Sequence, residues 1–123
     1  MSGLHLFAKM RIKPGFEASV TAAMDALATT VREKEPDTLF YGFYRSEESG
    51  CYYVQEHYKD AAAFVTHLEN SPEELEALVE GTEVDSTTLL GQMSPELHDM
   101  LDGFGASDEG SVYDFANAAY IGK

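Results

Sequence analysis

The sequence predicts an α+β fold in which two strand–helix–strand units form one antiparallel sheet. Three observations support this prediction. Apolar residues alternate with other residues in several short segments, which is typical of strands with one buried face. Two of the segments between them carry apolar residues at helical spacing. A polar, glycine-containing turn separates the two middle strands, as in an antiparallel hairpin.

The first strand is predicted over residues 4–12. Its apolar face carries every second residue, Leu4, Leu6, Ala8, Met10 and Ile12. The other face carries Phe7 among polar residues, so it is expected to contact another protein surface. Pro14 and Gly15 end the strand, and a helix follows that ends before Pro36. The predicted buried stripe of this helix consists of Phe16, Val20, Ala23, Met24, Leu27 and Val31.

The second and third strands are predicted over residues 38–45 and 51–58, with a polar turn between them. Tyr41 and Tyr44 lie on opposite faces of the second strand, so at most one of them points toward a pocket. The residues that share one face of the third strand are Tyr52, Val54, Glu56 and Tyr58.

Two helices are predicted after the third strand. Asp60 is a favourable N-cap for the first of them. The residues on one face of that helix are Phe64, His67 and Leu68. Ser71 and Pro72 favour the start of the second helix, and Gly81 is its expected C-cap. Residues 82–90 are predicted to form a fourth strand, and the order βαββαβ is the ferredoxin-like pattern.

The chain continues beyond this pattern. Ser94 and Pro95 favour the start of a short helix, and residues 112–121 are predicted to form a last strand. With 123 residues the chain is expected to be a single domain. Its two predicted parts are a core over residues 1–90 and a C-terminal helix–strand extension over residues 91–123.

The chain is strongly acidic, with 22 acidic and 8 basic side chains and a net charge of −14. Nucleic acid and anionic membranes are therefore not expected as partners, because both require positive surface. The single cysteine, Cys51, cannot form an internal disulfide, which fits a reducing compartment. No signal-peptide pattern and no apolar run near the ~20 residues of a membrane span occur. We expect a cytoplasmic protein.

No motif for a metal or a nucleotide cofactor is found in the sequence. The four histidines, His5, His57, His67 and His98, are not at metal-ligand spacing, and one cysteine cannot form a zinc site. Glycine-rich phosphate loops and flavin or nicotinamide fingerprints are also absent from the sequence. We therefore predict no metal site and no cofactor.

Three short segments resemble a known protein family. Residues 6–15 read LFAKMRIKPG and residues 56–60 read EHYKD. Ala63 and Phe64 follow, then His67 and the run from Asn70 to Pro72. In this order they resemble the antibiotic biosynthesis monooxygenase family over residues 1–90. The resemblance implies a ferredoxin-like subunit of a homodimeric α/β barrel.

The resemblance also implies a function. Cofactor-free members of the family oxidise substrates that react with oxygen, so a monooxygenase acting on a small phenolic or quinol compound is expected. His67 is the expected general base and Tyr58 the expected aromatic wall of the site. The residues expected to contact this small aromatic ligand are Met10, Tyr41, Phe64 and Glu56. Glu56 is further expected to pair with a basic group such as Arg11 or Lys9.

Alternatives to this function remain open. One is a non-catalytic ligand-binding or stress-related dimer, in which His67 is a core-edge histidine and Tyr58 only packs. Another is an isomerase of a small metabolite, because the superfamily that residues 56–60 resemble also includes an isomerase. Haem degradation is not expected. Haem-degrading relatives carry an asparagine at the position of Met10 and a haem-binding histidine at that of Ala77.

Overall fold

The computed structural model describes residues 3–47, 49–92, 94–103 and 110–113. The elements in chain order are β1 (Leu4–Ile12), α1 (Glu17–Lys34), β2 (Thr38–Arg45), β3 (Tyr52–Tyr58), α2 (Ala61–Asn70), α3 (Pro72–Gly81), β4 (Thr82–Leu90), α4 (Pro95–Gly103) and β5 (Gly110–Tyr113). The first strand–helix–strand unit, the hairpin and the fourth strand lie where the sequence predicts them.

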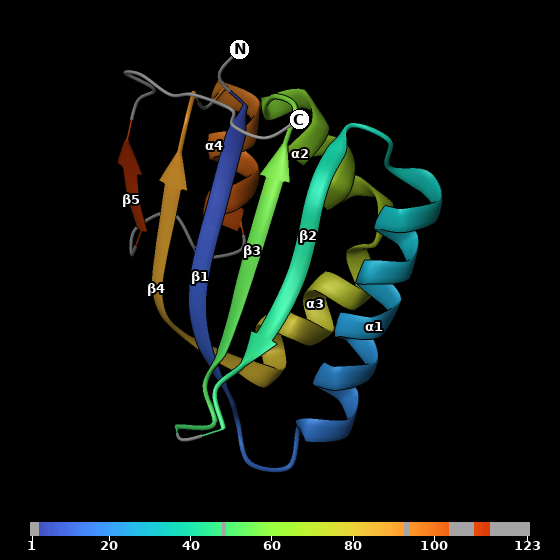
Figure 1. Cartoon of the computed structure of the whole chain (residues 1–123), viewed down its shortest axis with the longest axis vertical. Coiled ribbons are helices and arrows are strands. Elements are labelled where there is room, and N and C mark those ends of the chain that lie inside the picture. The colour runs from blue at the N-terminus through green and yellow to red at the C-terminus, as the bar shows by residue number, and fades with distance from the viewer. Residues whose placement is uncertain (1–2, 48, 93, 104–109, 114–123) are drawn as a thin grey trace, which may run out of the picture.

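The strands form one sheet in the order β2-β3-β1-β4-β5 (Figure 1). β1 lies between β3 and β4 and is antiparallel to both, and β2 is antiparallel to β3. This arrangement confirms the predicted ferredoxin-like α+β fold. β5 adds a parallel strand beside β4. It covers only the start of the predicted last strand, because residues 114–121 lie outside the described part of the chain.

The helices lie on one face of the sheet, and the hydrophobic core lies between the two layers (Figure 1). The alternation in β1 places its apolar residues against the helices, with Leu4 fully buried and Met10 only 3% exposed. α1 contributes Val20 and Leu27, which are also fully buried. The two-residue period of the strands and the stripe on α1 therefore build the core that the sequence predicts.

The starts of two helices follow the predicted capping. The Asp60 carboxylate accepts a hydrogen bond from the backbone N–H of Ala63 at 2.9 Å. The Ser94 hydroxyl accepts one from the backbone N–H of Leu97 at 3.1 Å. At α3 the proline at the first turn is present, but the Ser71 side chain makes no cap bond. Ser71 is the N-cap residue by position, and its side chain is buried.

Gly81 has a different role from the predicted C-cap. It is the last residue of α3, and the residue after it, Thr82, is extended rather than left-handed. A Cβ atom at Gly81 would collide with Cγ2 of Val20 and would lie 3.2 Å from Cβ of Phe16. Glycine is therefore required here because α1 and α3 approach each other closely.

No helix within the described ranges covers the other face of the sheet. It exposes aromatic side chains, with Phe7 at 40%, Tyr44 at 50% and Tyr53 at 42%. These residues line a hollow of about 250 Å³ together with Lys9 and Gln55. The mixed second face of the first strand is therefore partly exposed among the described residues. No helix among the described residues is long and apolar enough to cross a membrane.

Candidate functional site

His67 lies at the centre of a buried polar cluster between α2 and the sheet. Its side chain is only 1% exposed. The ring of Tyr41 on β2 lies 4.7 Å from the imidazole, and that of Tyr58 on β3 lies 5.8 Å away. The face of α2 that carries His67 also carries Phe64 and Leu68, as predicted. The amphipathic pattern of α2 thus turns the imidazole toward the aromatic residues of the sheet.

A buried carboxylate holds the imidazole in place. Nδ1 of His67 lies 2.9 Å from Oε1 of Glu35, the C-cap residue that follows α1. Thr38 donates a hydrogen bond to the same oxygen at 3.0 Å, and the Asn70 amide donates one to Oε2 at 3.3 Å. The sequence reasoning missed Glu35. Its position four residues after Val31, on the continuation of the buried stripe of α1, indicates that it faces the core.

A second carboxylate, Glu56, lies on the inward face of β3. Tyr41 is its cross-strand neighbour on β2, and the Tyr58 hydroxyl donates a hydrogen bond to its Oε1. The predicted pairing of Glu56 with Arg11 or Lys9 is wrong, because both basic side chains belong to the opposite face of β1. Arg11 instead pairs with two carboxylates of β4, those of Glu83 and Asp85.

The two buried carboxyl groups have opposite pKa shifts. Burial raises the pKa of Glu56 above its ordinary value, although the charge of His67 and the hydrogen bond from Tyr58 oppose this effect. Burial also acts to raise the pKa of Glu35. Hydrogen bonds from His67, Asn70 and Thr38, with the charge of His67, outweigh it and lower the pKa. Glu35 is therefore the anionic partner of the imidazole.

The two tyrosine hydroxyls in the cluster remain protonated. Burial, followed by the charge of Glu56, raises the pKa of both Tyr41 and Tyr58 well above the ordinary value. Each hydroxyl can therefore donate a hydrogen bond at neutral pH. The cluster combines an imidazole, two phenolic donors and two carboxyl groups in an aromatic environment.

Four of the other five residues predicted for the site lie around His67. These are Tyr41, Glu56, Tyr58 and Phe64, whose ring stacks on that of Tyr58 at 4.4 Å. Met10 does not join them. It lies opposite Tyr52 on β3, four residues along β1 from Leu6, which lies opposite Glu56. At ~3.3 Å per residue this places Met10 about 13 Å from the cluster along the strand.

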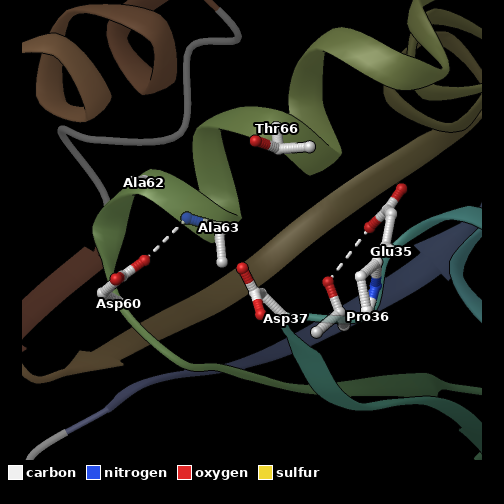
Figure 2. A pocket seen from close by; sticks show the side chains of 8 residues that line it. Glu35, Pro36, Asp37, Asp60, Ala62, Ala63 and Thr66 are labelled. Atoms are coloured by element: carbon white, nitrogen blue, oxygen red, sulfur yellow. Dashed lines mark hydrogen bonds between the residues drawn. The ribbon is translucent and has the colours of Figure 1, made fainter.

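A pocket of about 150 Å³ lies beside the cluster, between the start of α2 and the loop that joins α1 to β2. Figure 2 shows Glu35 and Asp37 on the loop side, and Asp60, Ala63 and Thr66 on the α2 side. Its lining is largely polar and includes the carboxyl groups of Glu35, Asp37 and Asp60. His67 and Tyr58 are not among the lining residues, so the wall that the pocket and the cluster share is Glu35.

No group of three or more metal-binding side chains is found in the ranges of the chain that the structure describes. The imidazole of His67 is engaged with a carboxylate through Nδ1. An imidazole held in this way can accept or donate a proton, and the described pocket reaches the cluster at Glu35 rather than at His67.

Three solved structures illustrate the similarity of the fold. MupZ from Pseudomonas fluorescens has a TM-score of 0.72 and 19% identity, and the match covers 98% of this chain and 95% of that chain. Rv0793 from Mycobacterium tuberculosis has a TM-score of 0.61 and 24% identity, with 76% and 97% covered. A conserved protein from Methanosarcina mazei has a TM-score of 0.59 and 23% identity, with 69% and 90% covered.

Identities below 25% show a common fold and no more. No curated protein matches the chain by sequence. A family model described as antibiotic biosynthesis monooxygenase matches residues 3–80, which include β1 and all but the last residue of α3, and so the whole polar cluster. The match over more than half of the sequence, together with the fold, shows that the chain belongs to the antibiotic biosynthesis monooxygenase family.

Proposed function

We propose that the protein is a cofactor-independent monooxygenase that acts on a small phenol or quinol. The observation that supports this proposal best is the arrangement at His67. The imidazole is 1% exposed, hydrogen-bonded through Nδ1, and flanked by the rings of Tyr41 and Tyr58. A base held in aromatic surroundings is suited to take the proton of a flat aromatic hydroxyl compound.

The proposed reaction takes all its electrons from the substrate. His67 accepts the hydroxyl proton, and the resulting anion forms a carbon–oxygen bond with molecular oxygen. The peroxide formed takes the proton back from the imidazolium. The carbon then loses its hydrogen as a proton while the O–O bond breaks, and the hydroxide released combines with that proton. One oxygen atom is thus added to the ring as a quinone carbonyl, and the other leaves as water.

Oxygen uptake measured with a series of quinols tests this function. His67→Ala is expected to lower turnover by roughly 10²–10⁴-fold, which is the usual contribution of a general base. His98→Ala, which changes an exposed histidine on α4, is the matched control and should leave turnover unchanged. An unchanged rate in the His67 variant would refute the role of this imidazole.

A second candidate function is binding of a small ligand without catalysis. The observation that favours it is the pocket, which reaches Glu35 but not His67. In this case a phenol would bind, as seen by chemical-shift changes in residues around Asp37 and Thr66, while no oxygen is consumed. An isomerase acting on a phosphorylated compound is less favoured, because the charged groups around the described pocket are the carboxylates of Glu35, Asp37 and Asp60.

We also propose that the open face of the sheet is covered by a second copy of the chain. Exposed Phe7, Tyr44 and Tyr53 form an apolar patch of a kind that single-chain proteins seldom leave in water. A two-fold interface of standard size would bury ~1,600 Å² in total. Light scattering should then give the mass of a dimer, and Tyr53→Glu should shift it to that of one chain. A folded wild-type protein that is monomeric at micromolar concentration would refute this proposal.

A further inference from the structure

The position of Glu35 is unusual for a glutamate. It is the C-cap residue that follows α1, where the helix dipole places partial negative charge and disfavours a carboxylate. Its side chain is also buried, at 5% exposed. A carboxylate in this place needs compensating contacts. Helix propensity and dipole therefore do not account for a glutamate here.

The compensation comes from three donors on two other elements. Thr38 at the start of β2 and both His67 and Asn70 on α2 direct their polar hydrogens to the carboxylate. Both oxygens of Glu35 are used. These hydrogen bonds fix the carboxylate in one orientation and favour its anionic form.

An anionic acceptor also determines which ring nitrogen of His67 is basic. A carboxylate accepts hydrogen bonds and cannot donate one, so Nδ1 of the neutral imidazole must carry its proton when it faces Glu35. The lone pair is then on Nε2, at the opposite end of the ring from Glu35. A hydrogen-bond partner on one ring nitrogen commonly selects the tautomer in this way.

We propose that Glu35 is a positioning residue that holds His67 in the tautomer with the proton on Nδ1 and a basic Nε2. The inference rests on the proposed function for its kinetic consequence, but the tautomer itself does not depend on it. Glu35 also lines the pocket beside α2, so a bound molecule in that pocket contacts the group that orients the base.

A purely structural role for Glu35, tying α1 to α2, makes a different prediction. Its loss would lower the melting temperature without changing the proton position on the His67 ring. Nitrogen-15 NMR of the histidine side chains in the whole protein distinguishes the two roles. The chain has only four histidines, and the spectrum of His67→Ala identifies the signals of interest.

In the wild-type protein, the neutral His67 ring is expected to carry its proton on Nδ1. In Glu35→Gln the amide can also donate to Nδ1, so a mixture of tautomers should appear and kcat should fall about 10²-fold or more, with KM within about threefold. Glu33→Gln removes the same charge from an exposed position in the last turn of α1. It is the matched control and should change neither the tautomer nor kcat.

Two results would overturn the inference. One is a wild-type His67 ring with its proton on Nε2, a result that does not depend on the folding of any Glu35 variant. The other is a Glu35→Gln protein with the wild-type tautomer and wild-type kcat. If no phenol or quinol is turned over by the wild-type protein, the proposed function fails while the NMR result still decides the role of Glu35. If His67→Ala abolishes turnover but Glu35→Gln does not, only this inference fails.

Discussion

Removing the hydroxyl of Tyr58 is expected to destabilise the protein more than its size suggests. The Tyr58 ring is fully buried, and its hydroxyl donates to Oε1 of Glu56, which is 7% exposed. Tyr58→Phe keeps the ring and its stacking on Phe64, but leaves a buried carboxyl oxygen without its donor. An unsatisfied buried polar group costs about 1–3 kcal/mol. Denaturant titration at neutral pH should show a loss of this size in the free energy of unfolding.

The loss should also depend on pH. The hydrogen bond from Tyr58 stabilises the ionised form of Glu56, so its removal raises the pKa of Glu56 further. The destabilisation by Tyr58→Phe should therefore grow as the pH rises through that pKa. Tyr44→Phe, at a half-exposed position on β2, is the control and should lie within about 0.5 kcal/mol of wild type. Equal effects of the two substitutions would refute the importance of the buried bond.

Two further predictions concern the carboxyl groups and the glycine of α3. The pKa of Glu35 is lowered in the folded protein, so Glu35 stabilises the fold above its ordinary pKa, and this contribution is lost as the pH falls through the lowered pKa. The pKa of Glu56 is raised in the folded protein, so Glu56 stabilises the fold at low pH, and this contribution is lost as the pH rises through the raised pKa. Unfolding curves of Glu35→Gln and Glu56→Gln between pH 3 and 8 should therefore differ from wild type with opposite pH dependence, and the same sign in both would contradict the assignment. Gly81→Ala should lower the free energy of unfolding by about 1–2 kcal/mol. Overpacking against Val20 costs about 1–3 kcal/mol, and the better helix propensity of alanine offsets about 0.5–1 kcal/mol of that loss. In a double-mutant cycle, Gly81→Ala should destabilise the protein less when Val20 is also changed to alanine. Equal destabilisation in both backgrounds would count against the contact.

Local patterns determined the secondary structure and the choice of buried faces. β1 begins and ends at the predicted residues because alternation over nine positions leaves one consistent assignment. The same two-residue period placed Glu56 and Tyr58 on one face of β3 and separated Tyr41 from Tyr44. The residues of the site that belong to α2 followed from helical spacing. In each case the interaction is between neighbours in the chain, so the sequence contains the information.

The partners of the buried charges were decided only by the tertiary structure. Glu35 and His67 are 32 residues apart and meet because α1 and α2 pack on the same face of the sheet. The basic partner expected for Glu56 was wrong because Glu56 lies on the inward face of β3, whereas Lys9 and Arg11 lie on the outward face of β1. The need for glycine at position 81 likewise depends on how closely α3 approaches α1. A contact between distant segments depends on the packing of whole elements, and no local period encodes that geometry.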